Sequence, residues 1–314
     1  GDQENSILAS ALDTEIRKTL SRNPALKVVA RTSSLAVKNQ GLTSEDLTEQ
    51  LGVTFLLEGS LIVTGGLMRI STSLIEGASG LVRWSNEYEG PPEDILKFQS
   101  DIARSVTANV TNEISQTDRT KRYGDTINAM AFQEFLRGRT LFRDSEGESD
   151  LVRAVSHFDR AIELDPEFAA AHAIKARLYT HQASLGVSIE AANALRSKAI
   201  ISAETAIDLA PDSDDAFSTL GYINFFAQLD IAAAKVPYER SRALGFGNAV
   251  VLTRYATFAA CNGNDAEALS AINRATELDP LNPTIFGRKG FIHYLAGRYQ
   301  DAVTFYTRAY DLRE

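Results

Sequence analysis

Residues 275–280 read Ala-Thr-Glu-Leu-Asp-Pro, and close variants of this stretch stand at 161–166 and 206–211. Each variant has the character of a helix end, because its small and apolar residues are followed by a proline that cannot continue a helix. Gly263 and two alanines after it also recur 34 residues later, beginning at Gly297. A fixed period of this length is typical of stacked units, so the second half of the chain is predicted to be an all-helical solenoid.

The 34-residue period and its small residues resemble the tetratricopeptide repeat (TPR), in which each unit is a pair of helices. About five units are expected, and they span roughly 129–166, 167–211, 212–246, 247–280 and 281–314. The second unit is long, with its excess near residues 184–194. The third is irregular and carries Pro237 inside its second helix, which predicts a kink or a shift there.

The first 116 residues have the pattern of a small α/β domain. Apolar spacing predicts helices over 7–20, 44–51 and 91–114, and β-rich or alternating runs predict strands at 26–30, 53–63, 68–74 and 81–84. Gly65-Gly66 indicates a hairpin between two of these strands. The predicted class is α+β, with an α/β domain at 1–116, a polar linker at 117–128 and an all-α TPR solenoid of about five helix pairs at 129–314.

Four segments of the first domain, at 28–34, 51–60, 68–75 and 84–88, resemble the TolB-N-terminal-like domain. Residues 135–139 also resemble the opening of the first repeat in proteins that carry this domain before TPRs. The combination is similar to the C-terminal regulatory half of bacterial class III adenylate/guanylate cyclases and of CadC-like membrane-bound winged-helix regulators. The resemblance implies attachment to a membrane only through a segment that precedes this sequence. It implies the periplasmic face of the inner membrane or, for cyclases without a membrane helix, the cytoplasm.

The start of the sequence predicts an open edge in the sheet. Domains of this kind usually begin with an apolar strand, and this sequence starts at Gly1-Asp2-Gln3, where that strand would have ended. An unpaired edge strand invites pairing with another chain, so a partner or a second copy is predicted to cover it. Because class III cyclases pair through their catalytic domains, the resemblance also keeps a homodimer as an alternative.

Composition and motifs exclude several functions. The chain has 314 residues, a net charge of −9 and one cysteine. One cysteine excludes a disulfide framework within the chain and a multi-cysteine metal site, and the negative charge argues against non-specific nucleic-acid binding. The sequence contains no Walker loop, nucleophile elbow or zinc-protease motif. We therefore expect no catalytic residue, metal or cofactor, and no enzyme activity from this chain alone.

The expected partner site is the concave groove, which the first helices of the units line in TPR arrays. On the register of the predicted repeats, the groove-facing candidates are Arg139, Arg143, Arg177, His181, Tyr222, Phe225, Phe226, Phe291 and Tyr294. Clustered arginines can hold a peptide carboxylate or an acidic motif, and aromatic rings can anchor apolar side chains. Packing against the neighbouring repeat explains the aromatic residues equally well.

A second candidate ligand site lies at the end of the strand predicted over 26–30, where α/β folds place ligands. Arg31 and the hydroxyls of Thr32 and Ser33 would hold an anion there, and Trp84 would line a pocket. Local bonds from hydroxyl to backbone, and packing of the tryptophan, explain the same residues equally well.

These patterns favour a non-catalytic sensor and protein-interaction region of a bacterial signalling protein, an adenylate cyclase, that binds a peptide or protein through its TPR groove. One alternative is the regulatory half of a winged-helix transcription regulator. Another is a stand-alone TPR adaptor, which an upstream effector domain in the intact gene would exclude. A third is an enzyme in its own right, for which the sequence offers no motif.

Overall fold

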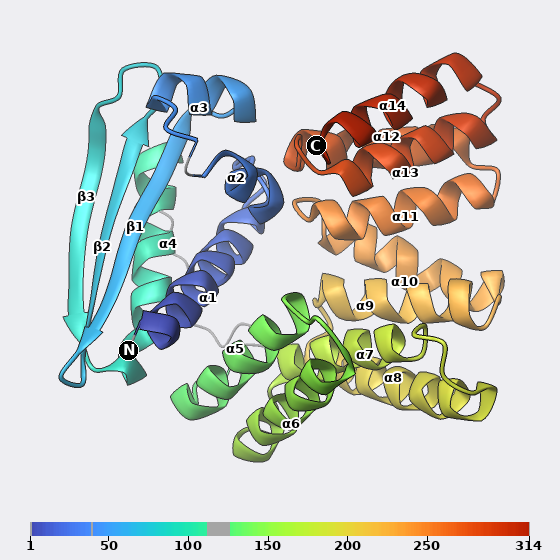
Figure 1. The fold of residues 1–314 in the computed structure, drawn as a ribbon, viewed down its shortest axis with the longest axis horizontal. Helices are drawn as coiled ribbons and strands as arrows, with labels where there is room; N and C mark the ends of the chain where they lie inside the picture. Colours follow the sequence, from blue (N-terminus) through green and yellow to red (C-terminus); the bar gives the residue numbers. More distant parts are fainter. Residues whose placement is uncertain (1, 39, 112–125, 314) are drawn as a thin grey trace.

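The computed structural model describes residues 2–38, 40–111 and 126–313 (Figure 1). In this part of the chain one antiparallel sheet has the order β1-β2-β3, with strands at Phe55–Thr64, Leu67–Glu76 and Val82–Gly90. The predicted hairpin is present between β1 and β2, where Gly65 and Gly66 have φ of 62° and 79°. Glycine adopts these positive angles at little steric cost, which suits a tight turn between twisted strands.

Two long helices cover one face of the sheet. The helices α1 (Asp2–Ser21) and α4 (Ile95–Thr111) pack against each other on the same side of it (Figure 1). On β2, Met68, Ile70 and Leu74 alternate with more exposed residues and are almost inaccessible to solvent, so the inner face of this strand lies in the core. The shorter elements are α2 (Arg31–Val37), α3 (Ser44–Leu51) and the 3₁₀ turn η1 (Pro92–Asp94).

One predicted strand is wrong. Residues 26–30 are extended but join no sheet in the described part of the chain, and residues 31–34, expected at the end of a strand, form the start of α2. The Ala30 N–H instead donates to the Leu278 carbonyl of the repeat array at 2.7 Å. Among the described residues β1 pairs with β2 alone. The partner predicted to cover its free edge stays a prediction.

A stack of helix pairs forms the second half, from α5–α6 at one end to α13–α14 at the other (Figure 1). The pairs within the described residues are α5 (Ala129–Arg143) with α6 (Glu148–Leu164), α7 (Ala169–Gln182) with α8 (Ile189–Leu209), α9 (Asp214–Tyr222) with α10 (Ile231–Leu244), α11 (Ala249–Cys261) with α12 (Asp265–Leu278), and α13 (Pro283–Leu295) with α14 (Tyr299–Asp311). The α+β class and the helical repeat array are therefore confirmed.

Small residues in the first helices allow the two helices of a unit to approach closely. A Cβ on Gly138 would lie 2.8 Å from the ring of Phe158, and a Cβ on Gly221 would lie 2.9 Å from the ring of Tyr238. Side chains do not tolerate contacts this short without movement of the backbone or of a ring. Gly138 and Gly221 thus mark close contacts between paired helices.

The second and third repeat units place their irregular segments at slightly different residues than the sequence predicted. The extra length of the second unit lies in the loop 183–188 and in the 21-residue α8. In the third unit, α10 continues through Pro237, and the distortion falls in a π-helical turn, η2 (Ile223–Ala227), at the end of the first helix. The boundary at residue 116 and most of the linker at 117–128 lie outside the described residues, and Asn128 caps α5.

The α/β domain and the first repeat share one hydrophobic core. Leu12 and Ile16 of α1 belong to the same cluster of buried side chains as Phe132 and Phe135 of α5. Farther along α1, the backbone of Ser21 closely approaches the start of the fourth unit. The helix α1 therefore lies along the side of the array that the first helices form (Figure 1).

A second contact joins α2 to the loop after α12, and we call it the Ser33–Asp279 latch. The Ser33 N–H and hydroxyl donate to Asp279 Oδ1 at 3.0 and 2.6 Å, and the Leu281 N–H donates to Ser33 Oγ at 2.9 Å. Ser33 and Asp279 are 0% and 2% exposed. The α/β domain therefore bridges the first unit and the junction of the fourth and fifth.

Candidate functional site

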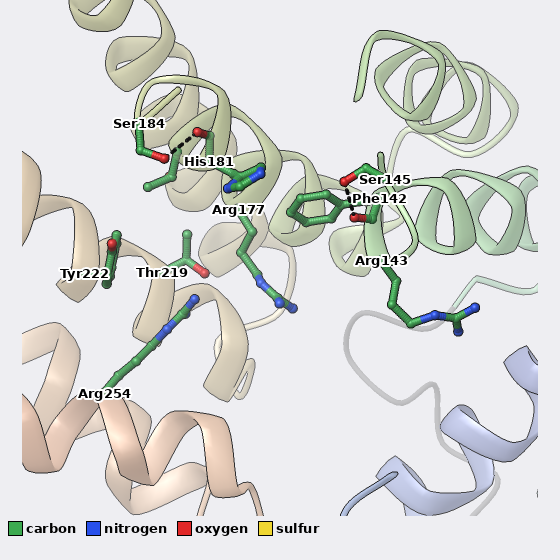
Figure 2. Close-up of a pocket in the computed structure, with 10 residues that line it drawn as sticks. Phe142, Arg143, Ser145, Arg177, His181, Ser184, Thr219, Tyr222 and Arg254 are labelled. Carbon is green, nitrogen blue, oxygen red and sulfur yellow. Dashed lines mark hydrogen bonds between the residues drawn. The ribbon is translucent and has the colours of Figure 1, made fainter. Parts of the chain in front are cut away.

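A cavity of about 470 Å³ lies beside α1, between the first helices of units one to four (Figure 2). Its lining side chains come from α5, α7, α9 and α11 and from the loops after α5 and α7, and they are Phe142, Arg143, Ser145, Arg177, Thr180, His181, Ser184, Thr219, Tyr222 and Arg254. Three of these are arginines, so the cavity is cationic although the chain is acidic overall.

Four of the predicted groove residues meet in this cavity, namely Arg143, Arg177, His181 and Tyr222. They belong to three different units, and the stacking of the units brings them together (Figure 2). Two of the three arginines expected in the groove, Arg143 and Arg177, therefore line one cavity. Its use by a partner stays a prediction.

Two of the cavity arginines already have acidic neighbours. Arg143 forms an ion pair with Asp144 at 2.6 Å, and its guanidinium also donates to the Ser10 hydroxyl of α1 at 2.9 Å. Arg177 Nη1 lies 3.4 Å from Asp215 Oδ2. Burial acts to raise the pKa of Asp215, but the charges of the nearby arginines outweigh it and lower that pKa. The carboxylate stays ionised and neutralises part of this positive charge.

Arg254 differs from the other two arginines. Its Nη1 donates to the Ser218 hydroxyl at 3.3 Å, and its guanidinium lies over the ring of Tyr222, 5.2 Å from the centroid. Among the described residues no carboxylate lies within 4 Å of it. Burial and the charge of Arg177 lower its pKa, against the opposing charge of the nearby Asp215 carboxylate, and an arginine remains protonated at neutral pH. Arg254 is thus a half-buried cation with donor capacity to spare.

Thr219 places a second unsatisfied polar group at the cavity. The residue is 1% exposed, and its Oγ1 has no hydrogen-bond partner among the described residues. A buried hydroxyl without a partner costs free energy that a bound acceptor or donor would recover. Thr219 and Arg254 together define where the cavity has the greatest capacity to bind a polar ligand (Figure 2).

The accessible position expected for Arg139 is wrong. Its guanidinium forms an ion pair with Glu15 of α1 and lies over the ring of Phe135, and its side chain is 17% exposed. Burial acts to raise the pKa of Glu15, yet Arg139 and nearby lysine outweigh it and lower that pKa. Because α1 covers this part of the groove, Arg139 holds the α/β domain to the array instead of facing a partner.

The aromatic residues predicted to line the groove have different surroundings in the structure. Phe225 packs edge-on against Phe258 at 5.4 Å, so the alternative of packing against the neighbouring repeat holds for this residue. Phe226 remains 41% exposed beside the cavity residue Tyr222. The last two candidates, Phe291 and Tyr294, lie on α13 and do not line the cavity.

The second candidate site does not form. Arg31 is engaged with α1, where it contacts Asp13 at 3.0 Å, and Ser33 is buried in the latch. Thr32 follows Arg31 in α2, whereas Trp84 lies on β3 opposite Leu74 and packs against the core. Ser33 therefore joins the two halves, Arg31 holds α2 to α1, and Trp84 packs with the core of the sheet.

Sequence reasoning missed Arg254 and Thr219. The register expected for the fourth unit turns Thr253, Thr257 and Cys261 towards the groove, so it passes over the adjacent Arg254. One signal was available, because Arg254 is the single charged residue of the apolar helix α11. For Thr219 no signal existed, because only the packed structure shows that its hydroxyl lacks a partner.

The described residues show neither a metal cluster nor a membrane span. Within them no group of three or more His, Cys, Asp or Glu side chains is arranged to hold a metal ion. None of the helices there has the length and apolar character needed to cross a membrane.

Comparison with known sequences identifies the repeats. The sequence model of the tetratricopeptide repeat family matches residues 262–314. A protein described as "Putative adenylate cyclase 3" from Rhizobium meliloti (strain 1021) is 29% identical over 175 residues, which are 55% of this chain and 30% of that protein. The chain therefore aligns with less than a third of that relative. TPR repeats are typical of interactions between proteins, and this is the level of function that the match supports.

Solved structures of TPR proteins are also similar. PilW, described as a type IV pilus biogenesis factor, has a TM-score of 0.48 and 17% identity, with 59% of this chain and 78% of that chain covered. YrrB, described as a TPR protein with an unusual peptide-binding site, has a TM-score of 0.39 and 21% identity, with 58% and 86% covered. Similarity at this level concerns the repeat fold alone.

Proposed function

We propose that this chain is the non-catalytic interaction region of a bacterial signalling protein, and that its repeat array binds an acidic peptide segment in the cavity beside α1. The observation that carries the proposal is the Arg254 guanidinium, which lines the cavity without a carboxylate partner among the described residues. The similarity to a protein named as an adenylate cyclase supports a signalling parent. A TPR array supports a peptide or protein partner.

A carboxylate suits the vacant donors. A guanidinium donates through several N–H groups in a fixed plane, which matches the two oxygens of a carboxylate. Arg177 lies near enough to lower the pKa of Arg254, so an added negative charge would relieve the repulsion between two cations. The Thr219 hydroxyl would supply another hydrogen bond. Asp215 already offsets part of this charge, so the cavity favours one carboxylate over a run of acids.

The bound carboxylate would belong either to an acidic side chain of the partner or to its C-terminus. Fluorescence anisotropy with four labelled peptides of one length separates them. One peptide has a free C-terminus after neutral residues, and the second is its C-terminal amide. The third is an amidated peptide with internal Asp and Glu, and the fourth replaces these acids by Asn and Gln. A chain-end site binds the first peptide only, whereas a side-chain site binds the third only.

Variants assign the binding to the cavity. Arg254→Gln should weaken binding by roughly 10- to 100-fold, because a hydrogen bond to a charged group contributes about 1.5–3 kcal/mol. Arg177→Glu should weaken it as well. Arg153→Glu is the matched control, because Arg153 is 64% exposed on α6 and lies outside the cavity. Failure of all four peptides to bind, or equal binding by wild type and Arg254→Gln, would refute the proposal.

The cellular setting is part of the same proposal. We place this region on the periplasmic face of an inner membrane, joined to an effector domain through a preceding segment, with the cytoplasm as the alternative. The similarity to a longer relative supports such a parent. Protease treatment of spheroplasts tests the location, because a periplasmic region is degraded while the inner membrane is intact. Protection until lysis would favour the cytoplasm.

A further inference from the structure

The turns inside units two and three expose an apolar patch beside the cavity. Its residues belong to the loop 183–188 with the start of α8, and to η2 with the start of α10. Their exposed fractions range from 39% to 81%. A single exposed hydrophobic residue needs no explanation, but a contiguous patch is typical of an interaction surface. We call the patch the apolar shelf, and it consists of Leu185, Val187, Ile189, Phe226, Leu229 and Ile231.

The two parts of the shelf are neighbours in space and border the cavity. The helix α8 contacts η2, and α7 contacts α9, so the turns that follow α7 and α9 lie at the same edge of the array (Figure 1). Ser184 and Tyr222 line the cavity. Leu185 follows Ser184 in the sequence, and the ring of Phe226 lies 4.8 Å from the ring of Tyr222. The shelf is therefore continuous with the rim of the cavity.

The shelf arises where these two units depart from the regular repeat. The loop 183–188 is part of the extra length of the second unit and supplies Leu185 and Val187. In the third unit the π-helical turn η2 supplies Phe226, and turns of this kind are frequent at functional sites. A surface built from such departures is a property of this chain rather than of the repeat fold.

Hydrogen bonds hold the turn of the third unit in place. The Asp230 N–H donates to the Asn224 carbonyl at 2.8 Å, and the Asn224 side chain donates to the Ala233 carbonyl at 3.1 Å. Within this turn Leu229 has a φ of 56°, and it is the one residue other than glycine with a positive φ among the described residues. That region is unfavourable for a branched side chain, so the surrounding turn imposes it on Leu229. The turn thereby holds an apolar side chain that is 81% exposed at a fixed position.

Charge gives the shelf and the cavity different ligand preferences. The exposed acids Glu190 and Asp230 are adjacent in sequence to shelf residues. A ligand carboxylate is repelled by these acids and attracted by Arg254 in the cavity. An apolar side chain carries no charge to repel and gains free energy by covering exposed apolar surface. The two features together therefore favour an acid in the cavity and an apolar side chain on the shelf.

We propose that the apolar shelf binds a bulky apolar side chain of the same peptide whose carboxylate enters the cavity. The partner would then carry one acidic group and one large apolar residue close together, without further acids beside the apolar residue. This inference rests on the proposed peptide binding and specifies the sequence that the site selects.

The length of the third unit's first helix sets the spacing between the two groups. Thr219 of the cavity and Phe226 of the shelf are seven residues apart, which is about 10 Å at 1.5 Å per residue. An extended peptide rises about 3.3 Å per residue and covers this length in about three residues. We therefore expect the apolar residue two to four positions from the residue that carries the carboxylate.

Fluorescence anisotropy with two labelled peptide series tests this spacing. One series has a single internal Glu and an amidated end, and the other has neutral residues and a free C-terminus. Each carries one Phe at one to six positions from the residue with the carboxylate, in a background of Gly and Ser, and a reference peptide has Ser in place of Phe. Phe at two to four positions should tighten binding roughly 5- to 30-fold over the reference, as expected when about half of its side chain is buried.

Variants assign the gain to the shelf. Leu185→Ser combined with Leu229→Asn should reduce the gain from Phe to less than about twofold and leave binding of the reference peptide unchanged. Because Asn tolerates a positive φ, Leu229→Asn alone should keep or raise the thermal midpoint while it weakens binding of the Phe peptide. Ile201→Ser is the matched control, since Ile201 is 63% exposed on α8 and lies about 18 Å along that helix from Ile189.

The outcomes separate this inference from the proposed function. Binding of the reference peptides with no gain from Phe at any position would overturn the shelf and leave the proposed function standing. Failure of every peptide to bind would refute both. A gain from Phe that persists in the double variant would overturn the shelf, because the apolar contact would then lie elsewhere. Sedimentation velocity without peptide tests another occupant, since a dimer that the double variant abolishes would assign the shelf to a second copy and overturn the peptide.

Discussion

Replacing Ser33 by alanine removes two hydrogen bonds between the α/β domain and the repeat array. The Ser33 hydroxyl donates to the buried Asp279 carboxylate at 2.6 Å and accepts from the Leu281 N–H at 2.9 Å. Asp279 keeps two other donors, the Ser33 N–H and the Asn282 side chain. A hydrogen bond to a charged group contributes about 1.5–3 kcal/mol and an ordinary one about 0.5–1.5 kcal/mol. The variant should therefore open the latch more easily by about 2–4 kcal/mol.

Hydrogen exchange measured by mass spectrometry reports this opening locally. An opening free energy lower by 2–4 kcal/mol corresponds to exchange roughly 30- to 1,000-fold faster in peptides covering residues 30–38 and 278–285. Ser34→Ala is the control, because the hydroxyl of Ser34 makes only contacts of 3.3 Å, with Arg17 and Ala30. It should change exchange less than about fivefold. Exchange in Ser33→Ala within threefold of wild type would show that the latch does not hold the halves together.

Two further substitutions test packing and charge. Gly138→Ala places a Cβ 2.8 Å from Phe158 and should lower the free energy of unfolding by about 1–3 kcal/mol. Gly287→Ala has no heavy atom within 4 Å and should raise it by up to about 1 kcal/mol, so equal effects in urea denaturation would contradict the packing argument. The pKa of Glu15 lies below its usual value of 4.5. Burial acts to raise this pKa, but the charge of Arg139 outweighs burial. The stability from this pair is therefore complete above pH 4.5 and is lost as the pH falls through the lower folded pKa. Glu15→Gln should flatten the dependence of the urea midpoint on pH in the acid range, and an unchanged profile would refute the assignment.

The placement of α1 limits which partners the array can bind. In this chain α1 lies against the first helix of the first unit and approaches the start of the fourth. A partner helix cannot occupy the same surface unless the shared core opens. The cavity lies beside α1, and its volume of about 470 Å³ suits a few side chains. This is why the proposed occupant is a short extended segment rather than a folded domain.

The repeats were predictable because their contacts are local. The units expected to start at residues 247 and 281 begin their helices at Ala249 and Pro283, and the hairpin at Gly65-Gly66 is where the pattern placed it. Helix periodicity, caps and tight turns depend on residues close in sequence. The strand predicted over 26–30 failed for the same reason, because its hydrogen-bond partner, Leu278, lies far along the chain.

The sequence by itself predicted a small mixed domain followed by stacked helix pairs, because the two helices of each pair are neighbours in the sequence. Only the tertiary structure decided which charges are satisfied. Arg139 and Arg254 both lie on first helices, yet Arg139 is paired with Glu15 of α1, whereas Arg254 lines a cavity with no described carboxylate within 4 Å. That difference depends on which surfaces meet when the halves dock, and contacts between residues more than a hundred positions apart leave no periodic trace in a single sequence.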